Sequence, residues 1–298
     1  MSVWKRLWRA KHLYLFLIPT FALLLVFSYY PPLFAIYNSF FQWDGFNERV
    51  FIGLQNFREM FTDKVFLASW KNLFILLGFS LVIGTSIPLI VAELIFNVAN
   101  DRWRYLYRLF FIIPMVVPGL VGTLLWRFIL DPNVGILNIL LEAIGGEEWR
   151  QPWLGSPRTV LPSFMIMGFP WVSGVNVLIY LAGLQSIPQE IFDASRIDGA
   201  EGVSRFLRID LPLVMGQVKL LLILGVIGGL QAYQAQLILT NGGPGYSSMM
   251  PGLVMYQEAF SYNRIGYANA IGLFTFLLIL GATYINMRYV KSAADITG

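Results

Sequence analysis

Six long stretches of the sequence have no charged residue, and each is mostly apolar. A bilayer core about 30 Å thick requires roughly 20 apolar residues of helix, and every stretch provides a run close to that length. The pattern therefore predicts six transmembrane helices, near residues 13–36, 72–94, 109–130, 160–184, 218–239 and 265–287.

The composition favours a membrane protein without a large soluble core. Hydrophobic residues make up 57% of the 298 residues and charged residues 13%, and the mean hydropathy is +0.64. In a soluble domain roughly a quarter of the residues are charged. We expect an all-α polytopic fold with a basic cytoplasmic N-terminus at residues 1–12, a transmembrane domain at residues 13–290 and a cytoplasmic tail at residues 291–298.

The positive residues indicate the orientation of the chain. Of the 21 Lys and Arg residues, thirteen fall on the side of the predicted helices that contains both termini and eight on the other side. Positive charge collects in cytoplasmic loops, so both termini are predicted to be cytoplasmic, and the net charge of +4 needs no nucleic-acid partner. Bulky residues rather than an A-x-A-like site follow the first apolar run, which favours an uncleaved anchor over a signal peptide.

Several kinds of chemistry have no basis in the sequence. The chain has no Cys and a single His, His12, which excludes disulfides, thiolate metal sites and multi-histidine clusters. No Gly precedes a Lys, so there is no phosphate-binding loop, and no G-x-S-x-G nucleophile elbow is present. We predict no catalytic residue, metal site or cofactor in this chain, and any ATP must be bound by another subunit.

The longest cytoplasmic loop, residues 186–212, has the pattern of two short helices. Ser186 is expected to cap the first, with Pro188 in its first turn, and Gly199 suits the left-handed residue after a helix end. Apolar and polar residues would form opposite faces of that helix: Ile187, Ile191, Ala194 and Ile197 against Glu190, Asp193, Arg196 and Asp198. Ser204 would cap the second helix. Such a loop can dock a partner or lie in the headgroup layer, and the pattern alone slightly favours the second.

Uncharged polar and aromatic residues gather in the fourth and fifth predicted helices. Buried charge, which marks many ion-coupled carriers, is almost absent from the spans. Amides and aromatic rings suit the hydroxyls and the apolar face of a neutral sugar, although such groups also bond between helices. The pathway candidates are Trp171, Gly174, Val175, Gln231, Tyr233 and Gln234. The small-xxx-small pattern from Gly225 to Gly229 is expected first of all to serve helix packing.

The loop at residues 186–212 resembles that of a known family. Asp193-Ala194-Ser195, three residues, Gly199, nine residues and Ile209-Asp210-Leu211-Pro212 are spaced like the EAA loop of ABC importer permeases, E-A-A, three residues, G, nine residues, I-x-L-P. Asp193 replaces the family's Glu and Ser195 its second Ala. Two segments around the loop are similar to the carbohydrate branch of this family: Leu184-Gln185-Ser186-Ile187-Pro188 and Ile197-Asp198-Gly199-Ala200. Further segments along the chain also agree with the family: Gly53-Leu54-Gln55-Asn56-Phe57, Leu125-Trp126-Arg127, Asp131-Pro132 and Leu239-Thr240-Asn241-Gly242-Gly243-Pro244-Gly245.

The resemblance implies a type I ABC importer permease (MetI-like) fold in a bacterial-type plasma (inner) membrane. It implies that the loop is a coupling helix on a separate ATPase, with coupling residues Asp193, Ala194, Ser195, Arg196, Asp198, Gly199, Ala200 and Pro212. The implied partners are a second permease, two cytoplasmic ATPase subunits that carry ATP and Mg²⁺, an extracytoplasmic solute-binding protein and membrane lipid. In this family the second permease is usually a different chain, although the sequence does not distinguish such a heterodimer from a homodimer. The substrate would be a sugar, an oligosaccharide or a related polyol.

Two other functions remain open from the residues alone. A stand-alone secondary transporter would work without an ATPase and would show an internal repeat, which is not evident in this sequence. A non-transporting membrane scaffold would use the cytoplasmic helix only for docking, and it leaves the polar cluster of the fourth and fifth helices unexplained.

Overall fold

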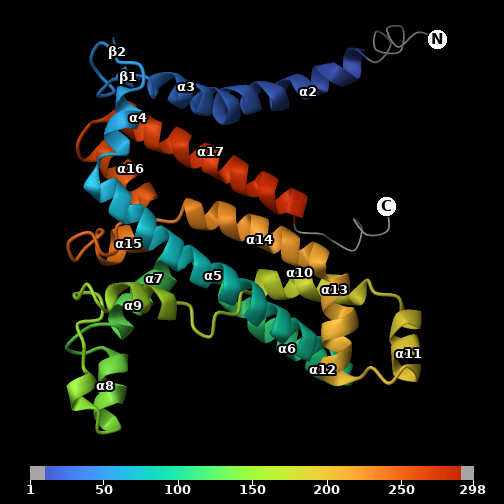
Figure 1. The fold of residues 1–298 in the computed structure, drawn as a ribbon. Coiled ribbons are helices and arrows are strands. Elements are labelled where there is room, and N and C mark those ends of the chain that lie inside the picture. The colour runs from blue at the N-terminus through green and yellow to red at the C-terminus, as the bar shows by residue number, and fades with distance from the viewer. Residues whose placement is uncertain (1–10, 290–298) are drawn as a thin grey trace. The chain divides into compact units, whose positions relative to one another are not determined.

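The computed structural model describes residues 11–289, and these are almost entirely helical (Figure 1). They form two compact units, one made of residues 11–63 with Met255–Phe274, the other of Lys64–Val254 with residues 275–289. The all-α prediction is confirmed. The predicted tail at residues 291–298 and most of the predicted N-terminus at residues 1–12 lie outside the described residues.

The first unit contains one long N-terminal helix and a small hairpin. Its elements are α2 (Lys11–Leu24), a π-helical turn (Leu25–Tyr29), α3 (Tyr30–Asn38), strands β1 (Phe41–Gln42) and β2 (Val50–Phe51), and α4 (Gln55–Met60). The two strands pair antiparallel, with Phe41 opposite Phe51. The amide of Asn56 on α4 donates to the carbonyl oxygens of Ser39 and Phe41, which fixes the hairpin against the helix.

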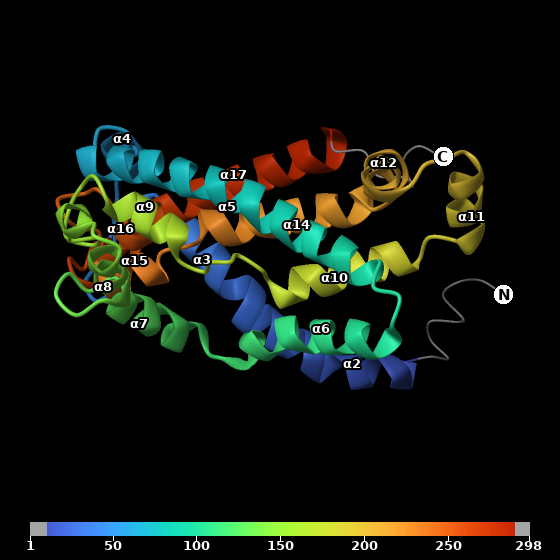
Figure 2. The same cartoon turned by 90° about the horizontal axis from the view of Figure 1, so that it is seen from below.

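The second unit contains most of the remaining helices. They are α5 (Lys64–Phe96), α6 (Asp101–Ile112), α7 (Gly119–Ile129), α8 (Ile136–Ala143), α9 (Val160–Ile166), α10 (Gly174–Gln185), α11 (Gln189–Ile197), α12 (Gly202–Arg205), α13 (Leu211–Leu213), α14 (Met215–Leu230) and α15 (Gln234–Leu239). Helices α16 (Pro251–Phe260) and α17 (Ile265–Tyr289) each have residues in both units. Within the second unit, α8 and α11 lie at opposite ends (Figure 2).

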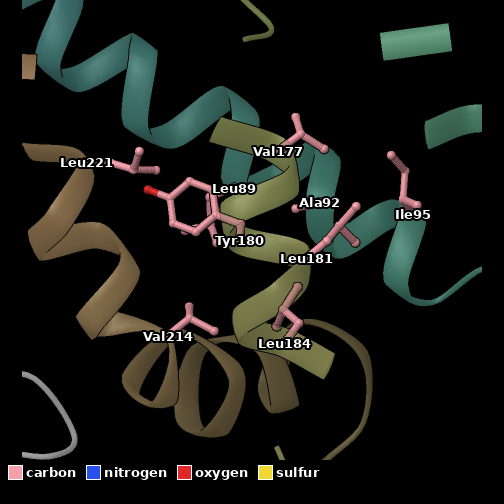
Figure 3. Packing of buried hydrophobic residues seen from close by; sticks show 9 residues of the cluster. All are labelled: Leu89, Ala92, Ile95, Val177, Tyr180, Leu181, Leu184, Val214 and Leu221. Atoms are coloured by element: carbon pink, nitrogen blue, oxygen red, sulfur yellow. The ribbon is translucent and has the colours of Figure 1, made fainter. Parts of the chain in front are cut away.

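Three helices, α5, α10 and α14, pack around one apolar core in the second unit (Figure 3). The buried side chains of this core are Leu89, Ala92, Ile95, Val177, Tyr180, Leu181, Leu184, Val214 and Leu221. Figure 3 shows the Tyr180 ring directed from α10 toward α14. Because α10 and α14 both bury side chains in this core, the loop between them is held at a defined place relative to α5.

The glycines of α14 allow its close approach to α5. A Cβ atom at Gly225 would lie 2.8 Å from Cδ2 of Leu81, and one at Gly229 would lie 2.5 Å from Cδ1 of Leu77. Both distances are shorter than ordinary van der Waals contact. The small-xxx-small pattern therefore serves packing within this chain, as expected.

Four helical segments among the described residues are long and apolar enough to cross a membrane: Tyr14–Asn38, Lys64–Phe96, Met215–Leu239 and Ile265–Tyr289. They correspond to the first, second, fifth and sixth predicted spans. The third predicted span is a bent pair, Asp101–Val116 with Gly119–Ile129, that turns by 89°. The fourth is divided into α9 and the 12-residue α10. The described residues therefore do not form six continuous spanning helices.

Proline explains both interruptions. In the third span Val117 is extended (ψ 123°) because Pro118 follows it, and Pro114 lies in the 3-10 turn before the bend. In the fourth, Gly168 and Trp171 have left-handed φ angles of +86° and +58°, and Pro170 between them has no N–H with which to continue a helix. The fifth span also has a break, at residues 231–233, although α14 and α15 together remain long enough to span.

Candidate functional site

Helix α11 forms the centre of the predicted coupling loop, at the end of the second unit opposite α8 (Figures 1 and 2). It begins at Gln189 with Pro188 at its N-cap position, so the prediction that Ser186 caps it is wrong. Ser186 instead ends α10, and its hydroxyl donates to the Gly183 carbonyl over 2.7 Å. Ser186 therefore lies three residues before the first residue of α11, which is too early for the N-cap position.

The end of α11 is the predicted one. Gly199 has a left-handed φ of +70°, and the Ala200 N–H donates to the Ser195 carbonyl over 2.8 Å. This is the Schellman arrangement, in which a glycine reverses the chain and the free carbonyls of the last turn are bonded. A Cβ atom at Gly199 would meet nothing within 4 Å. The glycine therefore lies on an open surface of this chain.

The predicted faces of α11 are partly wrong. Phe192 and Ser195 are the buried residues, whereas Ala194 is exposed and Ile197 is 87% exposed. The reason is that Phe96 at the end of α5 lies on the Phe192 side, with 5.6 Å between the ring centres. The outward surface of α11 thus combines Ile197 with the exposed ion pair of Asp193 and Arg196 (3.3 Å).

The second part of the loop also differs from the prediction. Helix α12 begins at Gly202, so Ser204 lies inside it and does not cap it. A π-helical turn, Phe206–Asp210, follows, and Pro212 lies in α13, which leads into α14. Glu201 holds the N-cap position without a side-chain hydrogen bond. Of the predicted coupling residues, Ser195 is buried, Ala200 is half-buried and Pro212 lies in the separate segment α13. The others are exposed on α11 and its C-terminal turn: Asp193, Ala194, Arg196, Asp198 and Gly199.

A second feature of the same unit is a cavity of about 840 Å³ among α5, α7, α9, α14 and α15. Four of the predicted pathway residues line it: Trp171, Gln231, Tyr233 and Gln234. The other two, Gly174 and Val175, do not. Gly174 instead permits α10 to begin against the end of α6, since a Cβ atom there would lie 2.5 Å from the Phe111 carbonyl oxygen.

The two helix breaks are located at this cavity. Residues 231–233 line it at the break between α14 and α15, and Trp171 lines it from the segment between α9 and α10. The amide of Gln231 donates to the Ile227 carbonyl over 2.9 Å, and the Trp171 indole N–H donates to the Met165 carbonyl over 2.8 Å. Side chains thus satisfy carbonyls where the helices stop.

Sequence reasoning missed the part of the cavity contributed by α5, α7 and α9. Ser80 of α5 and Thr123 of α7 supply hydroxyls, and Phe79 of α5 packs edge-to-face on Trp171 with 5.9 Å between the ring centres. The isolated polar residues of the second and third spans were the feature of the sequence that could have indicated this part of the lining. Among the described residues that line the cavity, none is charged.

One polar residue of the fourth span has a structural role. The Asn176 amide donates to the Gly84 carbonyl of α5 over 3.1 Å. Bonds of this type between helices are the alternative to a pathway role. The polar cluster therefore divides into groups that face the cavity and groups that join helices.

Comparison with known proteins places this geometry in a family. Residues 84–292 match the family described as "Binding-protein-dependent transport system inner membrane component". The chain is 32% identical over 284 residues to a probable ABC transporter permease protein, YurN, of Bacillus subtilis, which covers 95% of this chain and 97% of that protein. It is 31% identical over 276 residues to MsmF, the permease protein of the multiple sugar-binding transport system of Streptococcus mutans, covering 89% and 90% of the two chains.

Solved structures agree on the fold. A chain in the crystal structure of a bacterial ABC transporter involved in the import of the acidic polysaccharide alginate superposes with a TM-score of 0.83 at 24% identity, covering 97% of this chain and 99% of that one. A chain of the bacterial alginate ABC transporter in complex with an alginate pentasaccharide-bound periplasmic protein gives a TM-score of 0.84 at 23% identity, covering 98% and 99%. The predicted importer-permease fold is confirmed. With the family match and the relatives above, these likenesses show that the chain belongs to the inner membrane permeases of binding-protein-dependent ABC importers.

Proposed function

We propose that this permease moves a neutral sugar or oligosaccharide through the cavity at the two helix breaks. The observation that carries the proposal is the uncharged lining of amides, hydroxyls and aromatic rings. Amides donate to and accept from sugar hydroxyls, and aromatic faces cover the apolar side of a sugar ring. An acidic sugar would require a nearby cation, and among the described lining residues there is none. Neutral sugars are therefore favoured over uronates.

Transport kinetics test the cavity. Replacing both Gln231 and Gln234 by Ala removes two amides from the lining, and Ala at position 234 is a good helix former for the start of α15. We expect the KM for uptake of the neutral sugar to rise at least severalfold. Leu220→Ala, on an exposed position of α14 away from the cavity lining, is the matched control. Unchanged uptake kinetics in the double variant would remove the span-five half of the site.

The coupling loop is proposed to dock on a cytoplasmic ATPase. Its outward surface carries an exposed isoleucine and an exposed ion pair, and Gly199 opens onto space that this chain leaves empty. In this proposal both termini are cytoplasmic, ATP and Mg²⁺ are bound by two ATPase subunits, and a second, different permease completes the pathway. A solute-binding protein delivers the sugar from outside.

Two substitutions of Gly199 distinguish the effect of a large side chain on docking from the effect of backbone strain at this position. Gly199→Trp places a large side chain on the open surface, whereas Gly199→Asn keeps a small residue that tolerates the left-handed φ of +70°. We expect both variants to reach the membrane. The Trp variant should lose the ATPase in a mild-detergent pull-down and lose ATP-driven uptake, and the Asn variant should keep both.

The outcome of the same pull-down separates the remaining functions. A co-purified phosphate-loop ATPase and a second permease support the proposal. Normal uptake by Gly199→Trp would reject the docking surface. A chain that purifies alone and moves sugar in liposomes without ATP would instead be a self-sufficient carrier.

A further inference from the structure

Arg205, the last residue of α12, reaches three carboxylate or amide groups at once. Its Nε donates to Oδ2 of Asp210 over 2.9 Å, and its Nη2 donates to Oε1 of Glu93 over 3.1 Å and to Oδ1 of Asn97 over 2.6 Å. The side chain of Arg205 is only 16% exposed. The sequence pattern indicated no role for Arg205, so this network was not expected.

The partners of Arg205 belong to three different parts of the second unit. Glu93 and Asn97 lie at the cytoplasmic end of α5, and Asp210 ends the π-helical turn that leads into α14. The guanidinium also lies 5.3 Å from the centre of the Phe192 ring on α11. One side chain thus contacts the docking helix, the end of α5 and the turn that leads into α14, and both α5 and α14 contribute residues to the cavity.

The carboxylates that Arg205 contacts are removed from water. Asp210 is fully buried and the Glu93 side chain is 14% exposed, so each carboxylate depends on the guanidinium for compensation. The planar fork of Arg serves two acceptors in fixed directions, which a Lys ammonium does not. The Asn97 amide donates to Oε1 of Glu93 over 2.6 Å and holds that carboxylate in place.

The backbone between α11 and α12 gives a reason for such a link. Gly199 and Gly202 both have left-handed φ angles, and only a few residues connect the two helices. Besides Arg205, the aromatic pair of Phe192 and Phe96 joins α11 to α5. A displacement of α11 needs a stiff side-chain connection if it is to reach α5 and α14 together.

We propose that Arg205 is the positioning residue that makes α11 and the cytoplasmic ends of α5 and α14 move as one body, so that displacement of the docking helix reaches the cavity from two sides. The inference rests on the proposed function, because it needs an ATPase that displaces α11. It identifies which contact within this chain transmits that displacement. Ser80 and Gln231 are the cavity residues that would respond, one on α5 and one at the end of α14.

The test compares sugar uptake with ATP hydrolysis in the complete transporter, reconstituted with its ATPase and loaded binding protein. Arg205→Gln alone leaves two buried carboxylates uncompensated, so it is combined with Glu93→Gln and Asp210→Asn in a neutral triple variant. Arg205→Lys keeps a cation without the fork. Arg208→Met removes an exposed arginine of the neighbouring π-helical turn and is the matched control.

We expect the triple variant to assemble and hydrolyse ATP while sugar moved per ATP falls about fivefold or more, the lower range of measured coupling between sites. Arg205→Lys should give an intermediate ratio and Arg208→Met the wild-type ratio. A wild-type ratio in the triple variant, an equal loss in Arg208→Met, or failure of the neutral triple to assemble would each overturn the inference. If the wild-type complex itself showed no ATP-driven uptake, the proposed function would fail instead.

Discussion

Single residues decide how closely the helices of the second unit approach one another, and Gly229 is the clearest case. Gly229→Val would place methyl groups where Leu77 of α5 already lies, and overpacking of this kind costs about 1–3 kcal/mol. We expect a lower thermal midpoint in detergent. Gly228→Ala is the control, since a Cβ atom there meets nothing within 4 Å. An equal loss in both variants would contradict the contact with Leu77 as the cause, since Ala and Val both favour a helix more than Gly does.

The surroundings of Ser195 explain why Ser can replace the second Ala of the family pattern. Ser195 is 3% exposed, and its hydroxyl donates to the Phe192 carbonyl over 2.7 Å within the same helix. That carbonyl has a second lone pair for the backbone, so Ser195→Ala should change stability by less than about 1 kcal/mol. Ser195→Leu should destabilise the loop, because the position faces inward. A thermal-shift series would check this order, and a large loss in the Ala variant would contradict it.

At the scale of elements, the core of α5, α10 and α14 contains one polar group without a hydrogen-bond partner among the described residues, the Tyr180 hydroxyl. A buried, unbonded hydroxyl costs about 1–3 kcal/mol. Tyr180→Phe keeps the ring and removes that group, so we expect the variant to be more stable than wild type. Tyr180→Ala should lose about 3–5 kcal/mol through the cavity it leaves. Denaturation in detergent would measure both, and a less stable Phe variant would reveal a partner for the hydroxyl.

The elements also show what the sequence can predict. Apolar runs without charge correctly indicate the first, second, fifth and sixth spans because burial in lipid demands them. The breaks in the third and fourth spans were missed, although Pro118 and Pro170 mark them, since proline is tolerated within many membrane helices. Whether a proline bends or divides a helix depends on neighbouring segments that periodicity does not reveal.

The candidate site was predictable to a similar degree. Spacing predicted the left-handed Gly199 turn that ends α11, and polar residues in apolar spans indicated Gln231, Gln234 and Trp171, which line the cavity. The inward face of α11 was not predictable, because it follows from the position of Phe96, almost a hundred residues earlier in the chain. The role of Arg205 was missed for the same reason.

At the scale of the molecule, the first unit has a charged cluster of its own. Glu258 of α16 faces Arg264 at 3.2 Å, and Glu59 pairs with the same guanidinium. The guanidinium lies 4.4 Å from the centre of the Tyr267 ring, and the Tyr267 hydroxyl donates to the Asp63 carboxylate over 3.1 Å. Burial raises the pKa of Glu258 above its usual value, the carboxylates of Asp63 and Glu59 raise it further, and Arg264 opposes the shift. The folded state therefore binds this proton more tightly than the unfolded state.

The sign of the pH dependence follows from that shift. The stability that Glu258 contributes is fully present below the ordinary glutamate pKa and is lost as the pH rises through the raised folded value. We expect Glu258→Gln to reduce the fall in thermal midpoint between mildly acidic and neutral pH. Glu48→Gln, on the exposed part of the hairpin loop, is the control. An unchanged pH profile in Glu258→Gln would assign the dependence to another group.

The breaks at residues 167–173 and 231–233 have a mechanical consequence for the whole transporter. An intact helix resists bending, because its backbone hydrogen bonds must open in a medium without water to replace them. Here those bonds are already absent where the cavity lies, and the amide of Gln231 and the indole of Trp171 bond the freed carbonyls. Bending at either break would therefore open no further helical hydrogen bond, so a change in the width of the cavity would leave the flanking helical segments intact.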